Sequence, residues 1–136
     1  MKTFLDSGVL LTAWKGEEAD AMAALAVIED SGREFVSSQI VALELLPKPT
    51  YFQREDELEF YAKHLDAVKE SAALTPELTD AALVLAKKHG LAAQDALCLA
   101  SAIALGAGEF ITSELPGKPM FRVREIKVTT LHAAAR

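Results

Sequence analysis

Short apolar runs alternate with longer segments of helical period along the whole chain. The apolar runs are typical of buried strands, which we expect at Lys2–Leu5, Glu34–Ser37, Ala72–Leu74, Glu109–Thr112 and Ile126–Thr130. The segments between them are long enough to form helices, so most of the sheet should be parallel, with right-handed crossovers and helices on both faces. Ligands of such sheets bind beyond the carboxyl ends of the strands. The pattern therefore predicts an α/β fold with its functional site at that edge.

Hydrophobic residues spaced three and four positions apart predict the intervening helices. We expect these helices over residues 7–14, 17–30, 38–46, 58–68, 75–89 and 93–105. Ser7 and Ser38 are expected to cap the first and third of them, and Pro47 to end the third. Gly32 is expected to close the second in a left-handed conformation. The proline-containing segment Lys48–Gln53 is expected to be a loop.

The composition supports one folded domain over residues 1–136. The chain is 51% hydrophobic and 25% charged, which is enough for a packed core without a disulfide or a structural zinc. Its net charge of −6 excludes a nucleic-acid binder that works through bulk positive charge. The amino terminus has no secretory pattern and the single cysteine, Cys98, has no internal partner, so we expect a cytoplasmic protein. The weakly polar stretch Leu91–Gly108 predicts a buried helix rather than a membrane span.

Four acidic residues stand apart from the charge-rich helical faces that hold most of the others. Asp6 and Glu114 each follow a predicted strand. Glu44 and Asp95 each lie in a mostly apolar predicted helix. Desolvating an ionised carboxylate is costly unless a partner compensates it, and the neighbouring sequence offers Lys or Arg only at its margins. We therefore expect the four to meet around a divalent cation at the sheet edge.

Each of these carboxylates also has an ordinary explanation. Asp6 alone fits an Asx turn or a helix cap, and Glu44 alone fits a solvent-facing helical position. Asp95, near a helix start, complements the helix dipole, and Glu114 fits a solvated loop. A single site is favoured because all four acids are expected at the same edge of the sheet in an α/β chain.

All-oxygen ligation favours Mg²⁺ or Mn²⁺. Zinc is disfavoured because the three histidines, His64, His89 and His132, are scattered and Cys98 stands alone. A hard cation held by carboxylates lowers the pKa of a bound water and neutralises the charge that grows on a leaving oxygen. The expected chemistry is phosphodiester hydrolysis.

The residues around the four acids resemble the motifs of the PIN domain family, and within it the small VapC-like toxins of toxin–antitoxin pairs. FLDSGVLL is similar to the first motif and contains Asp6, and VSSQIVALELL is similar to the second and contains Glu44. GLAAQDALCLASAIALGAGEFITSE resembles the joined third and fourth motifs and contains Asp95 and Glu114. Its Gly-Leu-x-x-x-Asp-Ala-x-x-x-Ala pattern, running into Phe-Ile-Thr, is the most specific part of a resemblance that covers nearly the whole chain.

This resemblance implies a three-layer α/β/α sandwich with a mostly parallel sheet of about five strands. It also implies Mg²⁺- or Mn²⁺-dependent RNA cleavage with the four acids as catalytic and metal-binding residues, a homodimer, and an antitoxin partner whose segment enters the acidic site. Glu114 stands where the family usually has Asp, and the extra methylene moves the carboxylate, so ligation through water is an alternative to direct ligation. Small polar residues are expected to hydrogen-bond to the acids, although caps and turns explain them equally well: Ser7, Ser38, Thr112 and Ser113.

Positive charge gathers toward the carboxyl-terminal end. Residues 118–136 hold five Lys or Arg against one Glu, whereas residues 1–117 carry a net negative charge. The residues expected to contact RNA phosphates are Lys15, Lys48, Lys118, Arg122 and Arg124. The alternation over 122–124 is equally typical of a solvated edge strand.

The sequence thus favours a metal-dependent endoribonuclease, most simply a toxin. The alternative is a non-catalytic PIN-like module that binds RNA or protein, motivated by Glu114 and the net negative charge. A phosphoryl-transfer or receiver domain that uses Asp6 is weaker, because the chain lacks the second aspartate of a DxD motif and a glycine-rich phosphate loop.

Overall fold

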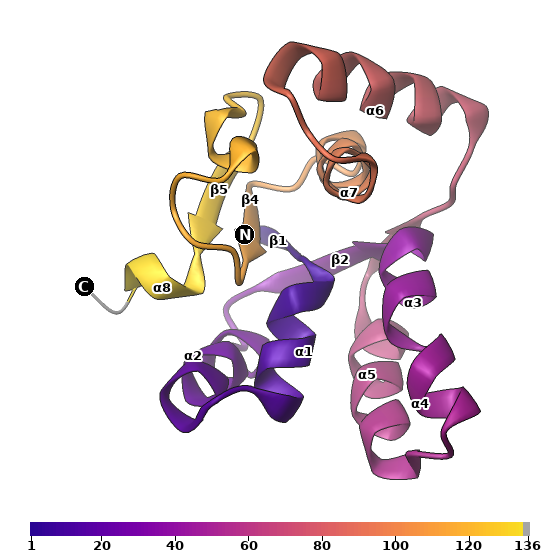
Figure 1. Ribbon diagram of the computed structural model, residues 1–136, viewed down its shortest axis with the longest axis vertical. Coiled ribbons are helices and arrows are strands. Elements are labelled where there is room, and N and C mark those ends of the chain that lie inside the picture. Colours follow the sequence, from indigo (N-terminus) through magenta and orange to yellow (C-terminus); the bar gives the residue numbers. More distant parts are fainter. Residues whose placement is uncertain (135–136) are drawn as a thin grey trace.

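Five parallel strands form one sheet in the middle of the molecule (Figure 1). The computed structural model describes residues 1–134, with side chains as far as His132. The strands are β1 (Lys2–Leu5), β2 (Glu34–Ser38), β3 (Glu70–Ala72), β4 (Glu109–Thr112) and β5 (Lys127–Thr130). They lie in the order β3-β2-β1-β4-β5, and each neighbouring pair is parallel. The α/β class with a parallel sheet of five strands is confirmed.

The strand order places the beginning of the chain at the centre of the sheet. From β1 the chain passes to β2 and β3 on one side and then returns to β4 and β5 on the other. Phe4 in β1 lies opposite both Val36 in β2 and Phe110 in β4. The direction of winding therefore reverses beside β1, and such reversal points are where open parallel sheets bind ligands.

Helices connect the strands and cover both faces of the sheet, which gives the expected three layers (Figure 1). They are α1 (Ser7–Lys15), α2 (Glu18–Ile28), α3 (Gln39–Leu45), α4 (Pro47–Tyr51), α5 (Glu55–Ala67), α6 (Pro76–His89), α7 (Ala93–Ala104), the 3₁₀ helix η1 (Pro119–Arg122) and α8 (Leu131–Ala134). The pair α6 and α7 covers one face, and α1, α2 and α5 cover the other.

Alternate strand residues build the two halves of the core, since successive side chains of a strand point to opposite faces. Phe4 and Phe110 are fully buried and stack with their ring centroids 5.3 Å apart. With Val36 they pack against the α6 and α7 layer. Leu5 and Ile111 pack against α1 and α2 instead. The central strands are thereby held on both sides, which fixes where their carboxyl ends lie.

Local signals explain several helix boundaries. The Ser38 hydroxyl caps α3 by accepting a hydrogen bond from Ile40 N at 3.3 Å, as the sequence predicts. Gly90 ends α6 with a φ of 71°, which favours glycine. Residues of the weakly polar stretch Leu91–Gly108 form α7, much of which is buried. Within residues 1–134, no helix has both the length and the apolar character needed to cross a membrane.

Two of the expected helix ends are wrong. Asp6, not Ser7, occupies the N-cap of α1. Gly32 does not adopt a left-handed conformation. Instead the Asp30 carboxylate accepts a hydrogen bond from Gly32 N at 2.9 Å, and this bond stabilises the turn after α2.

Three further segments differ from expectation. Lys48–Gln53 is not a loop throughout, because Pro47 both ends α3 and begins α4, where the first turn needs no N–H group. The third strand lies two residues earlier than expected, at Glu70–Ala72. Residues 122–124 are not an edge strand, since Arg122 ends η1 and Val123 is buried. Arg136, one of the basic residues counted above, lies outside the described residues.

Candidate metal centre

Adjacent strand ends place three of the four acids at one edge of the sheet. Asp6 follows β1 directly, and Glu114 follows β4 by two residues. Glu44 lies in α3, which begins directly after β2. Because β1 pairs with both β2 and β4, these segments leave the sheet side by side. A carboxylate oxygen of Asp6 and one of Glu44 lie within 4.8 Å of each other.

Asp95 reaches the same edge from the first turn of α7. This helix packs against β2, β4 and α3. The negative charges of Asp95 and Glu44 both act on Asp6, and the charge of Glu114 acts on Asp95. The fold therefore brings all four acids into one set of interacting charges.

Hydrogen bonds hold the acids in place. Thr112 Oγ1, at the end of β4, donates to Asp6 Oδ2 at 3.0 Å. The same hydroxyl accepts from Glu114 N at 3.1 Å, so Thr112 joins two of the acidic segments. Ser7 lies near Glu44 and lowers the pKa of that carboxyl, which partly opposes the effect of burial. Thr112 thus orients Asp6, and Ser7 lies beside Glu44.

Ser38 and Ser113 make other contacts. Ser38 Oγ accepts from Ser101 Oγ at 2.9 Å, which joins the start of α3 to α7. Ser113 Oγ lies so close to Gly8 that a Cβ at that position would come within 2.3 Å of it. Any larger residue at position 8 would displace Ser113, so Gly8 allows the segment after β4 to approach α1.

Burial dominates the electrostatics of this centre. It raises the pKa of Asp6 to about 7, and the charges of Asp95 and Glu44 add to the effect while the Thr112 hydrogen bond opposes it. Burial likewise raises the pKa of Glu44 and that of Asp95. Among the described side chains, no ion pair includes any of the four acids. Their negative charge is therefore not compensated by a Lys or Arg of that part of the chain.

The ordinary explanations do not account for these positions. Asp6 occupies the N-cap of α1, yet its side chain makes no capping hydrogen bond. Asp95 lies where the helix dipole would lower the pKa of a carboxyl, yet its pKa is raised. Glu44 is half-buried rather than solvent-facing. Capping, dipole and solvation therefore leave the clustering unexplained.

The donor set fits a hard divalent cation. Glu44 Oε1 is buried and has no hydrogen-bond partner among residues 1–132, although such oxygens are normally satisfied. A cation between Glu44 and Asp6 would satisfy this oxygen and offset the repulsion between the two carboxylates. Asp95 and Glu114 contribute none of the ligand atoms of the described residues that lie mutually within 4.8 Å, although the charge of Asp95 acts on Asp6 and that of Glu114 acts on Asp95.

Cys98 is the member of this centre that the sequence pattern did not single out. It is 1% exposed, and its Sγ lies within 4.8 Å of carboxylate oxygens of Asp6 and Glu44. Burial raises the pKa of its thiol, and the charges of these carboxylates and of Asp95 raise it further. The sequence signal that could have identified Cys98 is its spacing from Asp95. The two residues are three positions apart on one helix and therefore share a face.

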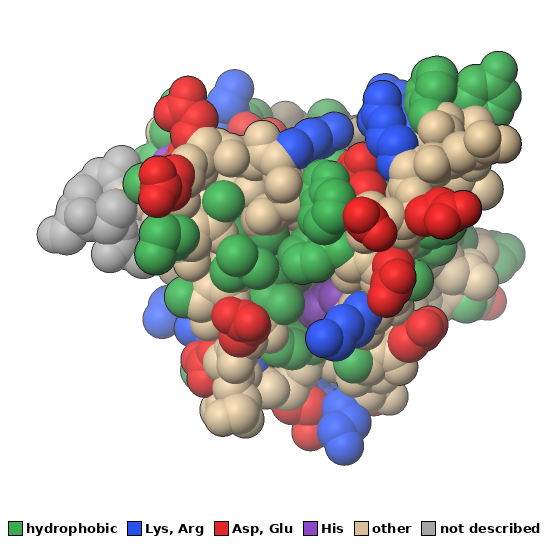
Figure 2. All heavy atoms as spheres, turned by 90° about the horizontal axis from the view of Figure 1, so that it is seen from below, with side chains coloured by type: hydrophobic (Ala, Val, Ile, Leu, Met, Phe, Trp, Pro, Cys, Tyr) green, Lys and Arg blue, Asp and Glu red, His purple; other side chains and the backbone are tan. Residues whose placement is uncertain are grey.

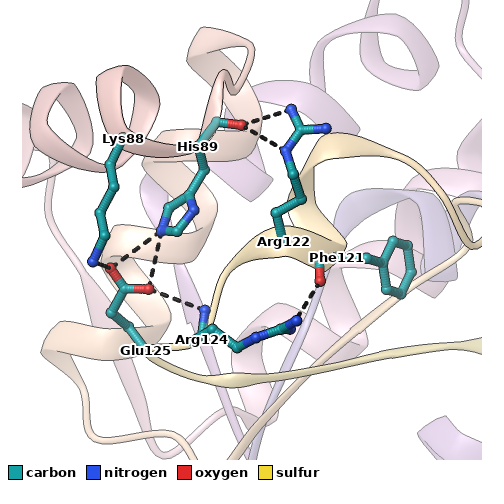
Figure 3. A network of polar contacts seen from close by, with 6 residues as sticks. All are labelled: Lys88, His89, Phe121, Arg122, Arg124 and Glu125. Atoms are coloured by element: carbon teal, nitrogen blue, oxygen red, sulfur yellow. Dashed lines mark hydrogen bonds and ion pairs between the residues drawn. The ribbon is translucent and has the colours of Figure 1, made fainter.

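Two of the arginines expected to contact RNA make hydrogen bonds within the protein (Figure 3). Arg122 donates from Nη2 and Nε to His89 O, at 2.8 and 3.3 Å. Arg124 donates from Nη1 to Phe121 O at 3.4 Å. Part of the donor capacity of both guanidinium groups is therefore already used.

Glu125 extends this network to the end of α6. Its carboxylate accepts a hydrogen bond from Lys88 Nζ at 3.2 Å and lies 3.1 Å from His89 Nε2 (Figure 3). The segment between β4 and β5 is thereby attached to the turn that leads into α7.

The three lysines expected to contact RNA are all exposed. No ion pair of residues 1–132 includes them. Lys15 ends α1, about 12 Å along that helix from its start beside Asp6. Lys48 lies in α4, just beyond the helix that carries Glu44, and Lys118 precedes η1.

An apolar hollow opens on the face covered by α1, α2 and α5. It has a volume of about 410 Å³. Its apolar lining comprises Leu10, Leu25, Ile28, Phe35, Phe60 and Ala67. The buried His64 also lines it, and burial lowers the pKa of this imidazole to about 4, so it is neutral at pH 7. Figure 2 shows hydrophobic side chains gathered on this face, with acidic and basic side chains around them.

Comparison with known proteins relates this arrangement to one family and to several solved structures. A model of the PIN domain matches residues 3–114. The chain is similar in fold to a chain of VapBC2 from Rickettsia felis bound to a promoter DNA fragment (17% identity, TM-score 0.68, covering 96% of this chain and 98% of that one). It is also similar to a chain of a toxin–antitoxin complex from Klebsiella pneumoniae (17%, 0.73, 95% and 97%) and of VapBC-1 from nontypeable Haemophilus influenzae (16%, 0.66, 97% and 99%). No curated protein matches the sequence.

The acidic centre should make folding stability fall as the pH rises from about 4 to 7 in the presence of a chelator. The pKa of Asp6 is about 7 in the folded chain against an ordinary value of 3.8, so the folded state holds a proton here that the unfolded state has lost. Asp6→Asn should therefore stabilise the protein at pH 8 by on the order of 1–2 kcal/mol, and far less at pH 4. Urea unfolding at both pH values measures this. The exposed Glu59→Gln is the control, and a loss of stability in Asp6→Asn at pH 8 would contradict the prediction.

Proposed function

The chain belongs to the PIN domain family, whose members are in general metal-dependent nucleases, and we propose that it is a metal-dependent endoribonuclease that acts as the toxin of a type II toxin–antitoxin pair. The observation that carries the proposal is the proximity of Asp6 and Glu44 oxygens, within 4.8 Å of each other, at a sheet edge where the charges of Asp95 and Glu114 also act and no ion pair of the described chain compensates them. The toxin assignment is supported by fold neighbours that come from toxin–antitoxin complexes.

In this proposal Asp6, Glu44 and Asp95 hold Mg²⁺ or Mn²⁺, and Glu114 contributes directly or through water. When bound, such a cation stabilises charge on the phosphate and lowers the pKa of a water. Thr112 holds Asp6 toward the centre through its hydrogen bond. Because burial raises the pKa values of these carboxyls in the metal-free chain, a cation that binds there displaces protons, and its binding should strengthen as the pH rises.

RNA approaches this edge of the sheet in the proposal, with phosphates contacted by exposed cations around it. Lys48 and Lys118 follow the segments of Glu44 and Glu114 and are the first candidates. Lys15 contributes only to RNA that extends along α1. Arg122 and Arg124 offer the N–H groups that they do not spend on backbone carbonyls. A cytoplasmic location follows from this choice of substrate.

Purified protein should cleave single-stranded RNA with Mg²⁺ or Mn²⁺ and not with a chelator. Asp95→Asn should lower kcat/KM by at least about a hundredfold, because it removes a charge from the metal centre while leaving the helix intact. Glu77→Gln, an exposed first-turn acid of α6, is the matched control and should retain activity. A gel assay on labelled RNA and growth after induced expression provide the readouts.

A non-catalytic PIN-like module is the second candidate, favoured by the longer Glu114 side chain. Calorimetry with Mn²⁺ separates the two functions. A nuclease should bind the ion with an affinity that Asp6→Asn weakens. A module that binds RNA or a partner protein without binding Mn²⁺, and that cuts no RNA, would replace the enzyme proposal.

We propose that the antitoxin covers the apolar hollow and sends a segment into the acidic centre. The hollow supports this because its lining is mostly apolar and only partly covered, so that an apolar side chain of a partner could fill it. The natural candidate for the partner is the product of a short reading frame beside this gene. A basic side chain of its segment would compensate the acids.

Binding of that product should depend on the hollow. Leu25→Glu places a charge in the hollow and should weaken binding at least about tenfold. Met22→Glu is the matched control, since Met22 lies on the same helix, is 64% exposed and does not line the hollow. Calorimetry on both folded variants measures the difference, and equal affinities would show that the partner binds elsewhere.

We also propose a homodimer formed through the outer surface of α6. Leu83 and Val84 are 52% and 65% exposed there, beside a small apolar groove between α6 and α7. Val84→Asp should therefore convert the dimer to a monomer, whereas Lys87→Glu on the same helix should not. Sedimentation equilibrium measures this, and a wild-type monomer at high concentration would refute the dimer.

A further inference from the structure

Cys98 lies in the acidic centre with no role assigned to it by the proposed function. We infer that Cys98 and the carboxylates of Asp6 and Glu44 form a three-ligand site for a thiophilic divalent cation such as Zn²⁺ or Cd²⁺, in competition with the hard cation. The inference rests on the proposal that this acidic centre holds a divalent cation. It adds a second ligand set that includes sulfur.

The positions of the ligand atoms support this set. The Cys98 Sγ and one oxygen each from Asp6 and Glu44 lie mutually within 4.8 Å. Ligand atoms around a tetrahedral Zn²⁺ are about 3.5 Å apart, given metal–ligand distances of about 2.0–2.3 Å. Small side-chain rotations of Asp6 or Glu44 can close the remaining gap. Three protein ligands with one open position are also typical of reactive zinc sites.

Burial and charge favour a soft cation here over a free thiolate. Cys98 is 1% exposed, and two carboxylates face it, so the free chain keeps the thiol protonated. A thiophilic cation can replace that proton. The S–H bond breaks, an S–metal bond forms, and the proton passes to water or to a buffer base. Mg²⁺ does not favour sulfur, so with Mg²⁺ the thiol remains a neutral neighbour.

The three residues also come from separate, well-fixed elements. Asp6 ends β1 and is held by Thr112 at 3.0 Å. Cys98 lies on α7, whose start is joined to the sheet through packing against β2 and β4. Glu44 Oε1 is the buried oxygen that lacks a partner within the described residues. The soft cation would satisfy this oxygen as the hard one does.

Titration of the full chain with Cd²⁺ tests the inference directly. A cadmium–thiolate bond gives an ultraviolet charge-transfer band, and Cys98 is the only cysteine in the chain, so the band has no other source. We expect the band to saturate at one Cd²⁺ per chain and to disappear in Cys98→Ser. Glu44→Gln should retain the band but raise the Cd²⁺ concentration needed for half-saturation at least about tenfold.

Two controls separate a ligand set from a thiol that merely reacts alone. Glu77→Gln should leave the titration unchanged. Circular dichroism should show that Glu44→Gln and Asp6→Asn remain folded, and either variant suffices if the other does not fold. The inference would be overturned if the wild type gave no band. It would also be overturned if the Cd²⁺ concentration for half-saturation were unchanged in both Glu44→Gln and Asp6→Asn.

The same preparation distinguishes this inference from the proposed function. Cd²⁺ should compete with Mn²⁺ for the shared carboxylates and should therefore suppress Mn²⁺-dependent RNA cleavage. If the carboxylate-dependent band appears but no hard cation supports cleavage, the nuclease proposal fails and the ligand set stands. If cleavage occurs but no band forms, the nuclease stands and the sulfur ligand is refuted.

Discussion

Repulsion between desolvated carboxylates is the constraint on which the rest of this structure depends. Asp6, Glu44 and Asp95 are held close together, partly buried, at the end of the central strands, with no cationic side chain of the described chain beside them. Such an arrangement opposes folding unless a cation is bound or protons are retained. The fold maintains it because the strands and helices that carry the acids are fixed by a large apolar core. This cost is the physical reason for the proposal that the site binds a cation.

The surrounding architecture restricts how these charges can relax. The stacked pair Phe4 and Phe110 fixes β1 against β4, so Asp6 cannot move away from the segment of Glu114. The Ser38–Ser101 hydrogen bond joins the start of α3 to α7, and thus limits the separation of Glu44 from Asp95. Relief therefore comes from a retained proton or a bound cation rather than from a shift of the backbone.

Charge is distributed so that attraction and repulsion act at different places. Exposed lysines lie around the acidic edge, whereas the arginines of the segment before β5 spend donors on the backbone. That network attaches the segment to the end of α6. The lining of the apolar hollow includes one acid, Glu29, and one base, Lys63, so it holds no cluster of like charges. The acidic centre and the apolar hollow therefore differ in chemical character and lie on different parts of one small domain.

The sequence by itself determined the alternation of strands and helices, because apolar period and caps such as Ser38 are local properties. It also determined which four acids stand in apolar surroundings, and the family resemblance gave the sheet its expected form. It did not determine α4, where Pro47 acts as both a stop and a start, or the turn at Gly32, where a neighbouring carboxylate replaced left-handed geometry. Only the tertiary structure placed Cys98 beside Asp6 and Glu44, gave Arg122 a backbone partner and formed the hollow. These features depend on the strand order and on helix packing, which bring together residues that are distant in the chain. Local sequence patterns do not indicate which distant residues will lie close together in space.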